Sequence, residues 1–337
     1  MFDDGRLDDE GALTRADPVL RELAGSGARV RVDAHTASDA IAALAAARRD
    51  ERPRAVVAAG PGSRLLRAVL EPVCPVPFVA WPGPGLPGWT GSLDLVVVTG
   101  VANGAAAQTT VTDAVRRGCP LLLTAPATSP LVELAASRWT TVLPTTAADV
   151  MATSVVTIEA LATLGLAPAV DAEEIARTLD AVAVGCSPFA DLGSNRAKQV
   201  ATSLADATPL LWGGSVLAAR AARRWAEGLR RAAGRPALAA EPADLVALLE
   251  SSTPRDVFAD PYEDPPADVA PYLLVLDDGV DVPAVRVEGG EVVAAAERSG
   301  VRHDRVVALD GGPLARYAAL TLTGQYVAAY LAVGLGR

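Results

Sequence analysis

The segment Leu93-Asp-Leu-Val-Val-Val-Thr-Gly100 is a short apolar run that ends on a glycine. Such a run is typical of a strand buried on both faces, because a half-exposed strand would alternate apolar and polar residues. The same pattern predicts strands at Arg54-Ala-Val-Val-Ala-Ala-Gly60, Pro120-Leu-Leu-Leu-Thr124 and Trp139-Thr-Thr-Val-Leu143. Ala-rich stretches of helical length occupy 38–49, 104–117 and 131–137. Apolar strands separated by helices predict a parallel α/β sheet covered on both faces.

The second half of the chain repeats this alternation. Its predicted strands are 208–212, 236–240, 272–277 and 305–309, and its predicted helices are 216–232 and 244–250. Between the halves, a long helix is expected over 145–166, followed by a helix over 172–183 that Asp171 caps. We therefore predict two domains, 1–166 and 167–337, each a three-layer α/β/α unit with a mainly parallel sheet. Two halves built alike indicate an internal duplication.

Composition excludes several classes of protein. Half of the 337 residues are hydrophobic and 21% are charged, which suits a large folded core. The formal net charge is −10, and no run of basic residues could form a nucleic-acid surface. Of the 30 basic residues, only Lys198 is a lysine. We expect no nucleic-acid partner.

Cysteine and histidine are too sparse for a disulfide scaffold or a zinc site. The three cysteines, Cys74, Cys119 and Cys186, show no C-x-x-C spacing. The two histidines, His35 and His303, lie far apart in the sequence, whereas a catalytic zinc site usually takes two or three. No metal, nucleotide or redox cofactor is expected.

The two ends of the chain bear on its location. The first ten residues are acidic, where a signal peptide needs a basic start and an apolar run, so a cytoplasmic protein is expected. The stretch from Tyr317 to Gly336 has no charge and approaches the length of a membrane span. Because it contains Thr321, Thr323 and Gln325, we expect a buried or half-buried C-terminal helix and no membrane partner.

Two turns of the first half follow strands, where ligands bind in parallel α/β sheets. They are Ala59-Gly-Pro-Gly-Ser-Arg64 and Thr99-Gly-Val-Ala-Asn-Gly104. Glycines let the backbone approach an anion, and the N-terminus of the following helix would favour a phosphate. Taken alone, the first turn favours an ordinary structural turn over phosphate binding, because Gly-Pro-Gly-Ser is common in such turns. The candidate ligand-binding residues are Gly60, Gly62, Ser63, Thr99 and Asn103.

The second half offers weaker candidates. Gly213-Gly-Ser215 is the equivalent turn, and the helix after it is rich in arginine, as expected of a solvated face. Glu227 and Arg231 lie four residues apart and predict a surface ion pair. His35, near the end of a predicted edge strand, and His303, in a polar loop, are interpreted as incidental.

Several segments together resemble the sugar isomerase (SIS) family, and in particular its bifunctional phosphoglucose/phosphomannose isomerases. The resemblance extends over nearly the whole chain. It is most specific at Leu95–Gly104, Gly118–Thr124, Asn195–Ala201, Thr208–Ser215 and Ala221–Trp225. Active members interconvert glucose 6-phosphate or mannose 6-phosphate with fructose 6-phosphate. The resemblance implies a sugar phosphate as ligand and a homodimer.

The family mechanism uses hydroxyls for the phosphate, an arginine, a glutamate base and a histidine. Where the family has Ser-Tyr-Ser-Gly-Asn-Thr, this chain has Thr99 for the first serine, Val101 for the second and Gly104 for the threonine, while Asn103 is kept. The family's Pro-Arg falls on or near Asp149-Val150.

The base is missing as well. The family's glutamate falls on Arg231, which cannot accept a proton at neutral pH, and no histidine lies between His35 and His303. The resemblance therefore implies a phosphosugar-binding regulator without efficient isomerase activity, whose catalytic residues are unknown. One alternative is an active isomerase that uses Glu227 as the base. Another is a purely structural interaction module whose sites are filled by side chains such as that of Val101.

Overall fold

The computed structural model describes residues 2–47, 52–99, 104–146, 149–252 and 269–337. The chain divides into two compact units. One spans 26–177, and the other combines 2–25 with 178–337. The N-terminal residues thus group with the C-terminal half of the chain. The predicted domains, 1–166 and 167–337, placed these residues with the first half instead. We name the two units the N-unit (26–177) and the C-unit (2–25 and 178–337).

The N-unit has a five-stranded parallel sheet in the order β2-β1-β3-β4-β5. Its strands are β1 (Val56–Ala59), β2 (Phe78–Ala80), β3 (Leu95–Thr99), β4 (Leu121–Pro126) and β5 (Thr140–Thr145). All four predicted strands are present, and β2 was not predicted. The central strands are buried along their full length, as continuous apolar runs require.

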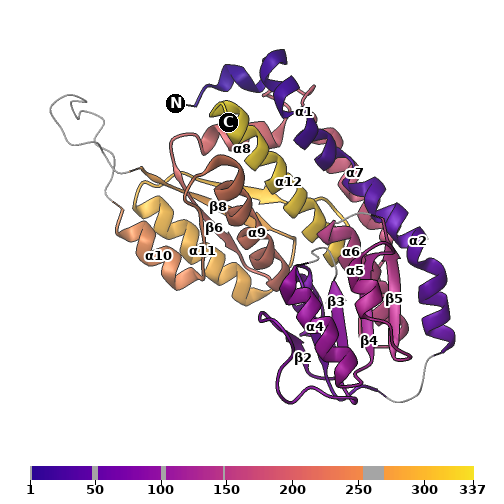
Figure 1. Ribbon diagram of the computed structural model, residues 1–337. Coiled ribbons are helices and arrows are strands. Elements are labelled where there is room, and N and C mark those ends of the chain that lie inside the picture. The colour runs from indigo at the N-terminus through magenta and orange to yellow at the C-terminus, as the bar shows by residue number, and fades with distance from the viewer. Residues whose placement is uncertain (1, 48–51, 100–103, 147–148, 253–268) are drawn as a thin grey trace. The chain divides into compact units, whose positions relative to one another are not determined.

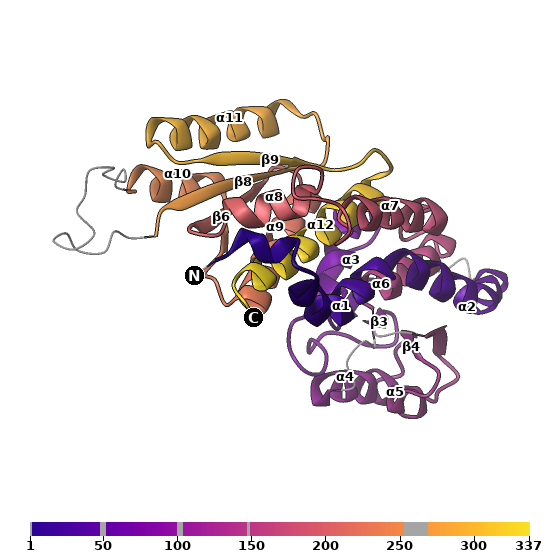
Figure 2. The same ribbon diagram turned by 90° about the horizontal axis from the view of Figure 1, so that it is seen from above.

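Helices cover both faces of this sheet (Figure 2). On one side lie α4 (Ala105–Arg116) and α5 (Pro130–Leu134), with Val111 and Leu131 packed against Val96 and Val98 of β3. On the other side lie α2 (Ser26–Ala46), α3 (Ser63–Leu70) and α6 (Val150–Thr163). The unit is therefore a three-layer α/β/α structure, as predicted.

The C-unit repeats the design with a four-stranded parallel sheet in the order β7-β6-β8-β9. Its strands are β6 (Thr208–Gly213), β7 (Leu238–Ala239), β8 (Pro271–Asp277) and β9 (His303–Val307). One face carries α10 (Pro242–Glu250) and α11 (Pro283–Arg298), and the other carries α8 (Arg196–Ser203), α9 (Val216–Ala233) and α12 (Pro313–Gly334) (Figure 1). The α/β class with two mainly parallel sheets is confirmed.

The C-terminal helix α12 is buried along most of its length, as predicted. It packs against α9, where the Trp225 Nε1–H donates to the Leu320 carbonyl oxygen at 2.7 Å. Gly324 makes this approach possible, because a Cβ at that position would lie 2.3 Å from Trp225 Nε1. Among the described residues, no helix is both long enough and apolar enough to cross a membrane.

The N-terminal segment differs from expectation. It forms a 3₁₀ turn, η1 (Asp4–Leu7), and two helices, α1 (Glu10–Ala24) and α2. The Asp3 N–H donates to the Gly334 carbonyl oxygen at 2.9 Å, which ties the start of the chain to the end of α12. The edge strand expected before His35 is wrong: His35 lies within α2, whose buried Val30, Asp33 and Ala37 recur at helical spacing.

Helix α7 (Ala172–Gly185) begins as predicted. The Asp171 carboxylate accepts hydrogen bonds from the Glu173 and Glu174 N–H groups at 2.9 and 3.1 Å, so the cap is confirmed. Helix α3 follows the β1 turn as expected, whereas helices α1, α8 and α11 were not predicted.

Candidate functional site

The turn between β1 and α3 is shaped by two glycines of the predicted set. Gly60 has a φ of +96°, and a Cβ on it would lie 2.5 Å from the Thr99 carbonyl oxygen. A Cβ on Gly62 would lie 2.8 Å from Ser154 Oγ and 3.2 Å from the Thr99 methyl carbon. No other residue fits at Gly60 without a backbone shift, so these glycines are required by the close approach of β1 and β3.

Thr99 holds this turn from the neighbouring strand. Its hydroxyl accepts a hydrogen bond from the Gly62 N–H at 3.2 Å and donates to the Ala59 carbonyl oxygen at 3.4 Å. The residue is 1% exposed. Both hydrogen bonds of its hydroxyl are therefore made within the protein. Thr99, which was predicted to contact a ligand, instead positions the β1–α3 turn.

The first turn of α3 presents groups suited to an anion. Gly62 occupies the N-cap position without a side-chain hydrogen bond to the helix, so the positive end of α3 is not capped by a side chain. Ser63 is 6% exposed, and no hydrogen bond of its hydroxyl is found among the described residues. Arg64 is exposed, and within the same ranges it forms no ion pair. Arg64 belongs to the turn predicted from the sequence, but it was not among the candidate ligand-binding residues.

The remaining predicted residue, Asn103, lies outside the described residues. Gly60, Gly62, Ser63 and Thr99 are brought together within the N-unit. Ser154 of α6 joins them, and its hydroxyl donates to the Val150 carbonyl oxygen at 2.6 Å. Nothing in the local sequence signals Ser154, because it comes from a helix far along the chain.

Asp149 stands at the place where the resemblance expects an arginine. Its carboxylate caps α6 by accepting the Met151 and Ala152 N–H groups at 2.8 and 3.0 Å. The same carboxylate pairs with Arg29 Nε of α2 at 2.7 Å. An arginine is therefore supplied to this helix terminus by a distant segment, 120 residues away in the chain. Sequence spacing could not reveal that pair.

The alternative base, Glu227, is held by arginines of its own helix α9. Its carboxylate lies 2.8 Å from Arg224, 3.4 Å from Arg231 and 3.9 Å from Arg220. The predicted pair with Arg231 is confirmed, and that arginine is largely exposed. Arg220 departs from the expectation of a solvated face, since it is buried. Three arginines therefore surround the carboxylate that would have to act as the base.

Neither histidine lies in a formed site. His35 is exposed on α2 of the N-unit, and His303 is exposed at the start of β9 in the C-unit. The prediction that His303 lies in a polar loop is wrong, because His303 is the first residue of the edge strand β9.

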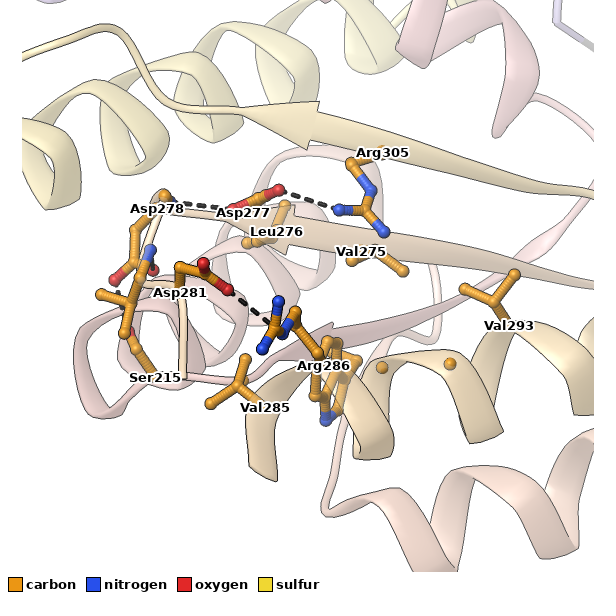
Figure 3. A pocket seen from close by; sticks show the side chains of 16 residues that line it. Ser215, Val275, Leu276, Asp277, Asp278, Asp281, Val285, Arg286, Val293 and Arg305 are labelled. Carbon is orange, nitrogen blue, oxygen red and sulfur yellow. Dashed lines mark hydrogen bonds and ion pairs between the residues drawn. The ribbon is translucent and has the colours of Figure 1, made fainter. Parts of the chain in front are cut away.

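The C-unit contains a cavity of about 490 Å³ at the carboxyl ends of β6 and β8, beside the N-terminal half of α11 (Figure 3). Its apolar lining includes Trp212, Val275, Val285 and Val293. Its charged side chains, labelled in Figure 3, are Asp277, Asp278, Asp281, Arg286 and Arg305. The Gly213–Ser215 turn on its wall was predicted from the sequence, but α11, and hence the cavity, was not.

The charged groups of this cavity are paired among themselves. Asp277 Oδ2 lies 2.9 Å from Arg305 Nη1, and Asp281 Oδ1 lies 3.2 Å from Arg286 Nε. The Ser215 hydroxyl donates to the Asp278 carboxylate and accepts the Ala218 N–H at 2.9 Å, which caps α9. Asp278 therefore lies at the N-terminal end of α9, where a bound anion would otherwise be favoured.

Comparison with known proteins agrees with this architecture. Residues 193–337 match the model of the bacterial phospho-glucose isomerase C-terminal SIS domain. None of the curated proteins matches the chain significantly in sequence.

Solved structures resemble nearly the whole chain. A candidate phosphosugar isomerase from Silicibacter pomeroyi superposes with a TM-score of 0.67 at 14% identity, covering 94% of this chain and 98% of that one. The tagatose-6-phosphate ketose/aldose isomerase of Escherichia coli gives 0.61 at 13% identity, with 91% of each chain covered. A glucose-6-phosphate isomerase-like protein from Thermus thermophilus gives 0.51 at 14% identity, with 98% and 93% covered. At these identities the likeness shows the fold. Residues 193–337 match an SIS-domain model, and the fold of the whole chain resembles that of phosphosugar isomerases and of a glucose-6-phosphate isomerase-like protein.

Proposed function

We propose that this protein binds a phosphosugar at the β1–α3 turn and acts as a regulator without efficient isomerase activity. The observation that carries the proposal is the first turn of α3. There, Gly60 and Gly62 let Thr99 and Ser154 pack against the turn, and the helix N-terminus has no side-chain cap. A phosphate at this position would be stabilised by the helix dipole, but not by the Gly62 and Ser63 N–H groups, which already donate to Thr99 and Gly60.

Two side chains add to this arrangement. The buried Ser63 hydroxyl is a donor for a phosphate oxygen, and Arg64 supplies a positive charge on the same turn. Asn103 remains a proposed ligand residue on the strength of the resemblance. Thr99 serves the site indirectly, by fixing the Gly62 amide.

The chemistry of isomerisation is the part that we propose to be impaired. Proton transfer between adjacent sugar carbons needs a general base, whose loss costs about 10²–10⁴-fold in rate. Arg231 replaces the base that the resemblance implies, and Glu227 is bound by Arg224 and Arg231. A binding role retained without catalysis fits a regulator or partner of a competent isomerase.

The binding half of the proposal is tested by the thermal unfolding of the protein with millimolar fructose 6-phosphate. We expect a rise in Tm in the wild type that is reduced in Arg64→Gln. Arg67→Gln is the matched control, because it removes the same charge from α3 one turn further on, where Arg67 pairs with Glu71. No shift in the wild type, or an equal loss in both variants, would overturn binding at this turn.

The alternative, an active isomerase with Glu227 as the base, is tested separately. Fructose 6-phosphate is incubated overnight with concentrated protein and followed by one-dimensional NMR. We expect no glucose 6-phosphate or mannose 6-phosphate above a blank. Product that disappears in Glu227→Gln would establish the alternative, and product that persists in that variant would remove Glu227 as the base.

The homodimer and the cytoplasmic location stay predictions. A sedimentation experiment on the full chain tests the first. The remaining alternative, a purely structural interaction module, predicts that no phosphosugar raises Tm.

A further inference from the structure

We infer that the cavity of the C-unit is a second binding site, for a small polyhydroxylated cation of the amino-sugar class. The inference does not depend on the phosphosugar proposal, because the cavity lies wholly within the C-unit and shares no residue with the β1–α3 turn. Its volume of about 490 Å³ is in the range of small-molecule sites.

The lining combines apolar and charged side chains. Trp212 and Val285 are among the apolar ones, and glycines bring them close. A Cβ on Gly289 would lie 2.9 Å from the Trp212 ring, so α11 packs directly on that tryptophan. The C–H groups of a sugar ring suit the apolar members of this lining, and its hydroxyls suit the carboxylate acceptors.

The charge balance of the cavity disfavours a phosphate. Its lining carries three carboxylates and two guanidinium groups, a net charge of −1. Both arginines are already paired, Arg305 with Asp277 and Arg286 with Asp281. The unbalanced group is Asp278, for which no ion pair is found among the described residues.

Asp278 is stabilised by neutral donors. It is 6% exposed and accepts hydrogen bonds from the Ser215 hydroxyl and, at 3.4 Å, from the Val280 N–H. Nearby Arg316 donates to the carbonyl oxygens of Gly311 and Asp278, at 2.7 and 2.9 Å, so it is engaged by the backbone. A carboxylate thus occupies the end of α9 that would attract an anion, and a phosphate there would meet like charge. An ammonium group would meet opposite charge.

Gly290 provides a direct test of occupancy. It lines the cavity, and a Cβ on it would have no atom within 4 Å. Gly290→Leu should therefore fill the cavity without disturbing the fold. Gly290→Ala is the matched control, because it makes the same gain in helix propensity and adds only a methyl group.

The experiment is saturation-transfer-difference NMR with D-glucosamine, D-glucose and glucose 6-phosphate, titrated against the full chain. D-glucosamine is expected to bind about threefold or more tightly than D-glucose, since one charge pair at a partly open site is a modest gain. Its signal should survive in Gly290→Ala and be lost in Gly290→Leu. An unchanged signal in Gly290→Leu, or none in the wild type, would overturn the site.

The charge of Asp278 is tested by a variant of its own. Asp278→Asn keeps the hydrogen-bonding shape and removes the charge, so D-glucosamine should lose its advantage over D-glucose. Asp206→Asn removes an equal charge from an exposed pair with Arg302 and should change nothing. Equal effects of the two variants would refute the role of Asp278. Loss of glucose 6-phosphate binding in Gly290→Leu would place the phosphosugar here and refute the assigned ligand class.

Discussion

Lys198 Nζ lies 2.6 Å from the Asp8 carboxylate, joining α8 to the residue that closes the N-terminal 3₁₀ turn. The lysine side chain is wholly buried, and it also donates to the carbonyl oxygens of Pro188 and Ala190 at 3.1 and 2.8 Å. Its ammonium lies 5.6 Å from the centre of the Tyr330 ring. This one side chain connects the N-terminal segment, the loop before α8 and helix α12.

Replacing that lysine should weaken the C-unit. In Lys198→Met the two carbonyl oxygens lose their donor, so a loss of about 2–4 kcal/mol in the free energy of unfolding is expected. Urea unfolding followed by circular dichroism measures it. Arg231→Met, which removes an exposed cation from the same unit, should change stability by no more than about 0.5 kcal/mol. Similar losses in both variants would contradict a structural role for Lys198.

The β1–α3 turn allows backbone strain to be separated from steric conflict. Gly60 and Gly118 both have positive φ, but a Cβ on Gly118 meets nothing within 4 Å, whereas one on Gly60 meets Thr99. Gly118→Ala should therefore cost about 1–2 kcal/mol, and Gly60→Ala clearly more. Thermal unfolding of the two variants measures the difference. Equal losses of stability would show that Thr99 of β3 can move away from a Cβ at position 60 without a further loss.

The contact between α9 and α12 gives a second pair of glycine variants. Gly324→Ala would force a methyl group against the Trp225 indole, which is held by its bond to Leu320, so a loss of about 2–3 kcal/mol is expected. Gly228→Ala, on the facing helix, meets only the Ala328 methyl at 3.7 Å. It should stabilise the protein by about 0.5–1 kcal/mol through helix propensity. Chemical unfolding should give changes of opposite sign.

Glu159 of α6 gives the N-unit a pH dependence. Burial, with a smaller effect of the Asp171 charge, raises its pKa from 4.5 to about 7. The folded state therefore binds the proton more tightly than the unfolded state, and stability falls as pH rises from about 4.5 to 7.

Glu159→Gln should flatten that part of the stability profile. Urea midpoints measured between pH 4.5 and 8 test this, with Glu133→Gln, on the exposed side of α5, as the control. A profile that keeps its slope in Glu159→Gln would assign the dependence to another group.

Sequence patterns predicted the strands well because burial on both faces leaves a local mark. Runs such as Leu95–Thr99 and Leu121–Thr124 contain little but apolar side chains, and their order along the chain predicts a parallel sheet. The N-terminal helices left no comparable mark. Val30 and Val32 mimic strand alternation, although Val30 is buried at helical spacing with Asp33 and Ala37.

The candidate sites were predictable only where their residues are close together in the sequence. The glycines at positions 60 and 62 indicate that another segment packs closely against the turn. They do not indicate that this segment is β3, or that the Thr99 hydroxyl accepts a hydrogen bond from the Gly62 N–H. The C-unit cavity depends on α11, a helix of mixed composition with a Gly-Gly pair that favours no element locally. Pairs such as Arg29 with Asp149 arise from folding alone.

The burial of Lys198 leaves the folded chain without an exposed side-chain amine, since it has no other lysine. Reagents and enzymes that modify ε-amino groups will find their target only when α8 separates from the N-terminal turn. Acylation of this single side chain therefore reports opening of the C-unit, with no background from surface lysines. Surface attachment of the native protein must instead proceed through other groups, such as carboxylates.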